Sequence, residues 1–408
     1  MKPASCLTFI AAFLPSPAAA VEYTVTTCAD LADVDNTLAT GLTIDSSTFF
    51  CDEYTRFRVR NTMTLKATGT AVEFSNFSLK VLGELTVEPD VTFTGVVDQV
   101  KNGGVLSVDE GAKATFVGTA DFSDNSVLIK QIGPISCGEG CTRIGRGLSY
   151  VTKKGGAVHN KGMLTFEGDA TFVRNLVSTD DSVEQGKAGA LSNTGSGSIL
   201  FKGKLTMEDN EADGSFEGQG GGIYNRGDIV VDGESYFSNN QASDGGAIYQ
   251  TKIGTMTFNA MTNFFENIAI DPVGGGVYNE GVMDFNAGSF FEGNIASSSG
   301  DGGLGGAIYN WSGGIITLTG STTFKANMAL AGGAIFNAGA NEDFDLPAAV
   351  TTFPADTVFV DNDADVREDD GAHAYTFRIF LLEQAAQACF VAAAVARARQ
   401  DIAINISM

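Results

Sequence analysis

The sequence predicts an all-β fold: a right-handed parallel β-helix of three sheets, with a helical N-terminal cap and a helical C-terminal tail. Three observations predict it. A glycine-pair motif recurs along the chain, an F-x-x-N motif alternates with it, and a short stretch of alternating apolar residues lies between them. Each repeat of roughly 25 to 33 residues holds three short strands, which find partners in the next repeat. The expected regions are 1–20 (signal peptide), 21–54 (cap), 55–365 (β-helix) and 366–408 (tail).

The first 20 residues have the features of a secretory signal. Lys2 supplies a positive start, Cys6 to Leu14 is apolar, and Ala18-Ala19-Ala20 fits a small-residue cleavage site. We therefore expect an extracellular or cell-surface protein that begins near Val21. An oxidising compartment favours disulfides, and we predict the pairs Cys28–Cys51 and Cys137–Cys141. Cys389 stays unpaired in this scheme.

The segment 28–40 is the candidate N-terminal cap. Leu31, Val34 and Leu38 follow one another at helical spacing, and a solenoid needs its end covered. The segment 55–130 alternates more loosely and is interpreted as irregular early coils.

The glycine-pair motif has the form G-G-A-[IV]-[YF]-N. Paired glycines permit a tight turn and a close approach between coils. His159 occupies the position that Tyr holds in other copies, and we interpret it as a substitution within the repeat. The copies are Gly155–Asn160, Ala188–Asn193, Gly220–Asn225, Gly245–Gln250, Gly274–Asn279, Gly305–Asn310 and Gly332–Asn337.

The F-x-x-N motif falls between these copies. It starts at Phe172, Phe237, Phe264, Phe291, Phe324 and Phe359, with a degenerate copy at Met207 and an early copy at Phe122. Asn tolerates the left-handed backbone at the end of a strand, and its amide can bond to the Asn one coil away. We expect ladders formed by Asn160, Asn193, Asn225, Asn279, Asn310, Asn337, Asn175, Asn240, Asn267, Asn294 and Asn327.

The third element is a pair of apolar residues two positions apart, such as Leu164/Phe166 and Ile229/Val231. Such alternation predicts a strand. The second residue of each pair always lies six positions before the next F-x-x-N motif, so the register is kept. Variable stretches run from each F-x-x-N to the next glycine pair. They emerge at one corner, which we expect to be the binding face.

The alternating motifs at about 155–362 resemble the repeats of chlamydial polymorphic outer membrane proteins, which are surface-exposed autotransporter passengers. Similar repeats occur in secreted β-helix proteins of eukaryotes. The resemblance implies a β-helix at the cell surface. It departs at the C-terminal end, because those autotransporters end in a large membrane barrel and 46 residues follow Asn362 here. We expect no transmembrane β-barrel, and the Ala-rich segment 375–399 is interpreted as a helical cap or tail.

The formal net charge is −24. Such a charge opposes binding to nucleic acid and favours cations, basic proteins or neutral glycans as partners. Arg56, Arg58 and Arg60 alternate on one strand face and are interpreted as a solvated face, with acidic-glycan binding as the alternative. Asn76, Asn310 and Asn405 begin possible glycosylation sequons.

Catalytic and metal-binding sets do not stand out. A zinc site at Cys137 and Cys141 would need two more ligands, and His159 and His373 are the two histidines available. Asp180-Asp181 and Glu368-Asp369-Asp370 lack the ligand spacing of a calcium loop, and Asp271-Pro272 is interpreted as a turn. We expect no cofactor, although calcium remains possible.

The leading hypothesis is a secreted or cell-surface adhesion protein, not an enzyme, that presents loops to an extracellular glycan or surface protein. The alternative is a polysaccharide lyase, hydrolase or epimerase of the pectate-lyase-like class, because many β-helix proteins act on polysaccharides.

Overall fold

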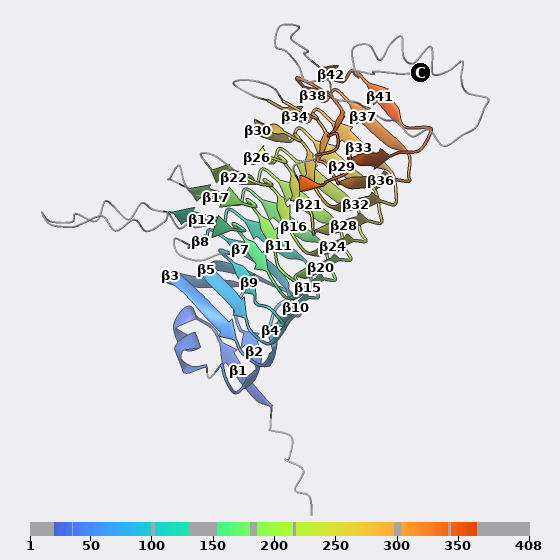
Figure 1. The fold of residues 1–408 in the computed structure, drawn as a ribbon. Coiled ribbons are helices and arrows are strands. Elements are labelled where there is room, and N and C mark those ends of the chain that lie inside the picture. Colours follow the sequence, from blue (N-terminus) through green and yellow to red (C-terminus); the bar gives the residue numbers. More distant parts are fainter. Residues whose placement is uncertain are drawn as a thin grey trace, which may run out of the picture.

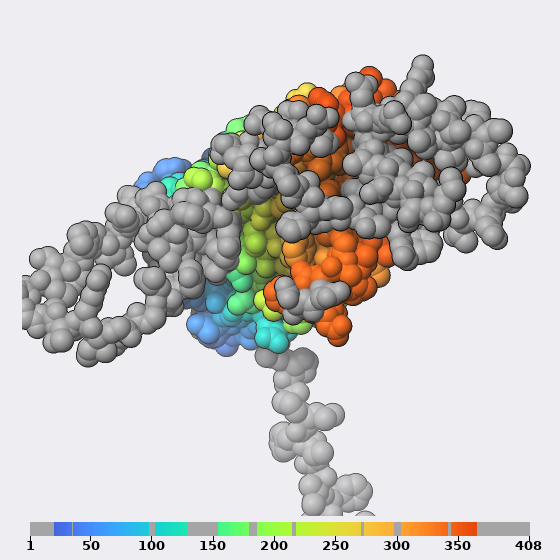
Figure 2. All heavy atoms as spheres, turned by 45° about the horizontal axis from the view of Figure 1, so that its top comes forward, coloured from blue at the N-terminus to red at the C-terminus, as the bar shows by residue number. Residues whose placement is uncertain are grey.

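The computed structural model describes residues 20–34, 36–98, 103–129, 153–179, 186–214, 218–297, 303–341 and 344–364. Parallel strands wind into a right-handed β-helix whose coils follow one another from β1 at one end to β41 and β42 at the other (Figure 1). In the space-filling view the colours succeed one another in bands along the rod (Figure 2), since each coil covers the next. The predicted fold class is confirmed.

Sheet A has 12 strands and is formed by the alternating apolar segments. Leu164 and Phe166, for example, stand in register with Ile199 and Phe201 of the next coil. The strands are β1 (Val21–Val25), β2 (Ala39–Ile44), β4 (Thr62–Ala67), β6 (Glu84–Val87), β10 (Lys113–Phe116), β15 (Met163–Phe166), β20 (Ser198–Phe201), β24 (Asp228–Val231), β28 (Thr255–Phe258), β32 (Val282–Phe285), β36 (Ile315–Leu318) and β40 (Val350–Thr352).

Sheet B has 19 strands in two ladders. The phenylalanine ladder contains the F-x-x-N strands: β3 (Thr48–Val59), β5 (Ala71–Val81), β7 (Asp90–Thr94), β11 (Ala120–Ser123), β16 (Ala170–Val173), β21 (Leu205–Glu208), β25 (Ser235–Ser238), β29 (Thr262–Phe265), β33 (Ser289–Glu292), β37 (Thr322–Lys325) and β41 (Val358–Val360). The glycine ladder contains the strands after the glycine pairs: β9 (Leu106–Val108), β14 (Val158–Asn160), β19 (Leu191–Asn193), β23 (Ile223–Asn225), β27 (Ile248–Gln250), β31 (Val277–Asn279), β35 (Ile308–Asn310) and β39 (Ile335–Asn337).

The two ladders are one sheet because β5 is long enough to pair with both β7 and β9. At Asn76, within β5, the chain passes directly from one ladder to the other. In every later coil, a further segment of the chain, described next, lies between the strand of the phenylalanine ladder and the strand of the glycine ladder.

This segment contributes a fourth strand to each coil, and these strands form sheet C, which the sequence did not reveal. Eight of its nine strands follow the Asn of an F-x-x-N motif, β8 follows Val96, and all nine lie on the side opposite sheet A in Figure 1. They are β8 (Val97–Asp98), β12 (Ser126–Ile129), β17 (Leu176–Thr179), β22 (Glu211–Gly214), β26 (Gln241–Asp244), β30 (Ile268–Val273), β34 (Ile295–Ala296), β38 (Met328–Ala329) and β42 (Asp363–Ala364). A two-stranded sheet, β13 (Lys153–Lys154) with β18 (Gly186–Lys187), lies where the chain returns from sheet C to the glycine pairs. The expectation of three strands per repeat was therefore wrong.

The interior is one continuous apolar cluster that runs from Val25 to Ala334. Phe side chains stack on their equivalents one coil away, with ring centroids 4.8 Å apart for Phe237 and Phe264 and 4.7 Å apart for Phe264 and Phe291. Met207 interrupts this stack between Phe172 and Phe237, as its position in the ladder shows. Successive repeats thus share one core.

The two glycines of each pair have different functions. The first adopts a positive φ, for example +70° at Gly220. The second has no room for a side chain, because a Cβ on Gly221 would lie 2.3 Å from the Gly246 carbonyl oxygen and 2.6 Å from the backbone of Gln241 in sheet C. Sheet C therefore folds back directly over the glycine pairs.

The left-handed residue of the F-x-x-N motif is the one before the Asn. Arg174, Asn239 and Glu266 have φ values of 51°, 53° and 51°. The prediction that Asn itself takes this conformation is wrong, because the Asn side chain has to point inward to reach its neighbours.

The N-terminal region differs from the predicted helical cap. The helix in 28–40 is a short 3-10 helix, η1 (Cys28–Asp33), and Ala39 already begins β2. Leu38 is 60% exposed, so it makes no apolar helix face. The predicted C-terminal helical tail at 366–408 lies outside the described residues.

A candidate ligand-binding groove

The candidate site lies on the outer face of the glycine ladder, which is opposite the core. One side chain per strand points outward there, in register from coil to coil. We call this set the middle row: Arg58, Lys80, Ser107, His159, Ser192, Tyr224, Tyr249, Tyr278, Tyr309 and Phe336. It forms the floor of the groove.

Two further rows form the walls. The return row precedes the glycine pairs and contains Lys154, Lys187, Gln219, Asp244, Val273, Leu304 and Ala331, which are linked by parallel bridges. The turn row follows each ladder Asn or Gln and contains Lys161, Thr194, Arg226, Thr251, Glu280, Trp311 and Ala338. Apolar members of both walls pack against the tyrosines in a second cluster that is separate from the core.

The tyrosines of the middle row form a stack. The ring centroids of Tyr249 and Tyr278 are 4.4 Å apart, and both hydroxyls donate to the Glu280 carboxylate at 3.1 and 3.0 Å. Burial, with the negative charge of Glu280, raises the pKa of both hydroxyls well above the ordinary value. Both tyrosines therefore stay protonated and act as hydrogen-bond donors.

A depression of about 290 Å³ opens beside this stack. Its volume is near the lower limit for small-molecule sites in proteins. The lining residues are Lys187, Gln219, Tyr224, Arg226, Tyr249, Thr251, Lys252, Ile253 and Glu280. Lys187 Nζ lies 4.9 Å from the centroid of the Tyr224 ring, as in a cation–π contact. Aromatic, cationic and acidic groups of all three rows thus meet in one place.

Several buried polar atoms in and beside the depression lack a hydrogen bond of normal geometry within the described part of the chain. They include Gln219 Oε1 and Thr251 Oγ1 in the walls, and Ser192 Oγ and both ring nitrogens of His159 on the floor. Buried polar atoms normally find partners, so unpartnered ones mark places where a ligand or water is expected.

His159 and Ser192 stand where later coils have tyrosine. His159 is 3% exposed and Ser192 is fully buried. Burial, with the nearby charges of Lys154 and Lys161, lowers the pKa of His159 to about 3, so the imidazole is neutral at pH 7. The middle row is therefore closed to solvent at these two coils.

The Asn residues of the F-x-x-N motifs lie side by side in the interior. Asn175 Nδ2 donates to Asn210 Oδ1 at 2.9 Å, and the same bond repeats between all neighbours from Asn125 to Asn362. These positions include the sequence-predicted Asn175, Asn240, Asn267, Asn294 and Asn327. Asn125, Asn210 and Asn362, which were not among the predicted ladder residues, belong to the same chain of bonds.

The Asn residues of the glycine motifs form a second line. Asn160 donates to Asn193, Asn193 to Asn225, Asn279 to Asn310, and Asn310 to Asn337. Between the two halves stands Gln250, which accepts from Asn225 and donates to the carbonyl oxygens of Gly254 and Val282. Its longer side chain thus redirects the donor to the backbone.

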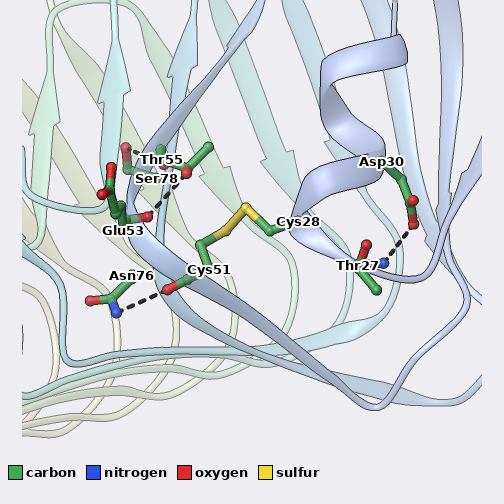
Figure 3. The surroundings of a disulfide bond; sticks show 8 residues. All are labelled: Thr27, Cys28, Asp30, Cys51, Glu53, Thr55, Asn76 and Ser78. Atoms are coloured by element: carbon green, nitrogen blue, oxygen red, sulfur yellow. Dashed lines mark hydrogen bonds between the residues drawn. A yellow bond between two sulfur atoms is a disulfide. The ribbon is translucent and has the colours of Figure 1, made fainter.

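Cys28 and Cys51 form a disulfide that ties η1 to β3 (Figure 3). Asp30 accepts hydrogen bonds from the backbone N–H groups of Thr26 and Thr27, which lower the pKa of its carboxyl group. Asn76 donates to the Cys51 carbonyl oxygen at 3.1 Å. Cys137 and Cys141 lie outside the described residues.

The remaining sequence candidates are distributed as follows. Arg56 on β3 donates to Ser78 Oγ and to the Gly103 carbonyl oxygen. Asp271 and Pro272 lie within β30, so the prediction of a turn there is wrong. Asn310, which begins a possible sequon, is fully buried. Asp180-Asp181, Glu368-Asp369-Asp370, His373 and Asn405 lie outside the described residues.

The described residues contain no group of three or more His, Cys, Asp or Glu side chains placed to hold a metal ion. Among the same residues, no helix is long and apolar enough to cross a membrane.

Sequence reasoning named the Tyr position of the motif but not the groove. The groove became visible only with sheet C, because the return row forms one of its walls. The missed signal is the cation or polar residue just before several glycine pairs, at Lys154, Lys187 and Gln219.

A family model for the Chlamydia polymorphic membrane protein repeat matches residues 234–251. The chain carries a polymorphic membrane protein repeat. The match spans β25, β26, one glycine pair and β27, which is most of one coil. No curated protein and no solved structure is significantly similar to the chain. The repeat and the parallel sheets together indicate a surface protein with a β-helix fold.

Proposed function

We propose that this protein is a secreted or cell-surface binding protein, and that it holds an extracellular glycan or surface protein in the groove beside Tyr224 and Tyr249. The observation that carries the proposal is the convergence of the three rows on one depression with unpartnered polar atoms at Gln219 and Thr251. Rigid elements hold these side chains in place, since the floor is a parallel ladder.

The groove has the chemistry of a recognition site. Tyr and Arg are the residues that most often carry binding energy at protein surfaces. Arg226 is exposed in the wall and Ile253 is 61% exposed at the rim, so a ligand reaches both. A partner that covers them gains apolar contact and hydrogen bonds together.

The test is a screen of the mature protein, residues 21–408, against glycan arrays and surface-protein extracts of the source cells. For each ligand found, the double variant Arg226→Ala/Thr251→Val is compared with Lys204→Ala/Thr257→Val, which likewise removes one cation and one threonine hydroxyl but on other faces. We expect at least tenfold weaker binding for the groove variant only. Equal affinity of the two variants would place the ligand elsewhere and overturn the proposal.

The same samples decide the alternative of a polysaccharide-active enzyme. Pectin, alginate and any glycan that binds are incubated with the protein and examined for new reducing ends or unsaturated products. Stoichiometric binding without product supports the binding role, whereas turnover that the groove variant abolishes would replace it with catalysis.

A further inference from the structure

The positive charges of this acidic protein are not evenly distributed. The net charge is −24, yet the outer face of the glycine ladder carries a series of cations. They are Arg56 and Arg58 on β3, Arg60 directly after it, Lys80 on β5, and then Lys154, Lys161, Lys187, Arg226 and Lys252 along the groove. We call this series the basic strip.

Register links the two ends of the strip. Arg58 pairs with Lys80, Lys80 with Ser107, and Ser107 with His159, so Arg58 and Lys80 continue the middle row, and the later cations lie in the two rows beside it. Strands in a sheet lie about 4.8 Å apart, and the line from Arg58 to Tyr249 therefore runs on the order of 30 Å. This is the length of several monosaccharides in a chain.

Cations on the other faces are mostly neutralised within the protein. Arg174 pairs with Asp124 at 2.7 Å, and Lys202 pairs with Glu167 at 2.7 Å. Within the strip, Lys80 pairs with Asp109 at 3.0 Å, whereas Arg58, Lys161 and Arg226 are exposed and have no carboxylate within 4 Å in the described ranges. Their charge is available to a ligand.

Members of the strip also lie close enough together for their positive charges to repel one another. Burial, with the charges of Lys161 and Arg226, lowers the pKa of Lys154. These positive charges lie close together and repel one another, beside the unpartnered polar atoms of His159 and Ser192. A bound anion would offset this repulsion and stabilise the strip.

We propose that the basic strip binds the acidic groups, carboxylate or sulfate, of an anionic polysaccharide whose chain lies along the rod. This rests on the proposed function, because the strip continues into the same groove. The cations come about once per coil, a spacing that suits one charge per sugar. Duplex DNA carries one charge per about 1.7 Å and would meet the acidic remainder of the protein.

The glycan also explains why basic and aromatic residues follow one another. Arginine and lysine hold acidic groups at Arg58, Lys161 and Arg226. Beside Arg226, Tyr224 and Tyr249 offer aromatic edges and a wall of hydroxyl and amide groups to the less polar faces of the sugars.

The experiment measures the affinity of the mature protein for fluorescent oligogalacturonate, a heparin-derived hexasaccharide, a neutral galactan oligosaccharide of equal length and a DNA duplex. We expect binding to one or both acidic glycans that weakens at least tenfold from 50 to 300 mM NaCl. The two acidic probes distinguish carboxylate from sulfate. Stronger binding of the neutral probe or of DNA would overturn the proposal.

Variants locate the site. Arg58→Ala/Lys161→Ala/Arg226→Ala should lower the affinity at least twentyfold, whereas Lys202→Ala/Lys204→Ala should leave it unchanged. Unchanged affinity in the triple variant would overturn the proposal. If a neutral glycan binds and the Arg226→Ala/Thr251→Val variant loses that binding, the groove is a binding site but its ligand is not an acidic polysaccharide.

Discussion

Asn240 shows how much one side chain contributes to this fold. Its Oδ1 accepts from both the backbone N–H and the Nδ2 of Asn210, and its own Nδ2 donates to Met207 O and Asn267 Oδ1. The residue is fully buried. All its hydrogen-bonding capacity is therefore used across three coils.

Replacing Asn240 with Ala should lower the free energy of unfolding by about 3–5 kcal/mol, because it leaves buried donors and acceptors unpaired on both neighbours. Urea unfolding followed by circular dichroism measures the change. Asn259→Ala, at an exposed Asn, is the control and should stay within about 0.5 kcal/mol. A loss below about 1 kcal/mol at Asn240 would contradict this role.

His159 predicts a pH dependence of stability. Its pKa is about 3 in the folded protein and about 6.5 in an unfolded chain, so the unfolded state takes up a proton first as the pH falls. Stability is thus full above pH 6.5 and decreases toward pH 3. Lys154 and Lys161 face the imidazole and oppose its protonation.

His159→Phe tests this directly, because Phe336 already fills the same row. Between pH 7 and pH 4 the wild type should lose about 3 kcal/mol more than the variant in unfolding free energy. Denaturation curves at several pH values give both slopes. Parallel slopes for the two proteins would show that His159 does not resist protonation.

At the scale of the strands, the glycine pair is the joint between sheet C and the glycine ladder. Gly221→Ala should cost about 3 kcal/mol or more, because its Cβ would meet the Gly246 carbonyl oxygen at 2.3 Å. Gly222→Ala is the matched control. Its nearest neighbour is at 3.0 Å and other coils have Ala there, so we expect a change within about 1 kcal/mol.

Thermal unfolding of the two glycine variants is sufficient to compare them. Similar melting temperatures would mean that sheet C can move away from the glycine pair at little cost.

The strands also show what a sequence can reveal. Phe and Asn at fixed spacing predicted the ladders because each motif residue contacts its own copy. Sheet C was missed because β22, β34 and β38 each bury a single small residue, Ala212, Ala296 and Ala329, which gives no alternation. The groove was missed for a related reason, since the line from Arg58 to His159 passes through β5, where no glycine pair signals the ladder.

At the scale of the molecule, each coil contacts its neighbours alone, so stability is local along the rod. The Cys28–Cys51 disulfide lies at the N-terminal end, where β1 and β3 contact η1. Removing it should affect that end first.

Cys28→Ser/Cys51→Ser should destabilise the N-terminal coils by about 2–4 kcal/mol through greater freedom of the unfolded segment. Hydrogen exchange should become faster in β1 to β3, while β31 to β37 keep the protection of the wild type. Uniform acceleration along the whole chain would instead indicate that the rod unfolds as a single unit.

The carboxamides of the two asparagine lines all donate in the same direction, from each coil to the next one along the chain. Their dipoles add instead of cancelling, and each polarises the one that follows except at Gln250, which donates to the backbone. The rod therefore has a chemical direction: one end presents acceptors and the other presents donors. A transplanted coil or a second rod could extend it only with the same orientation, since an inverted one would set donor against donor.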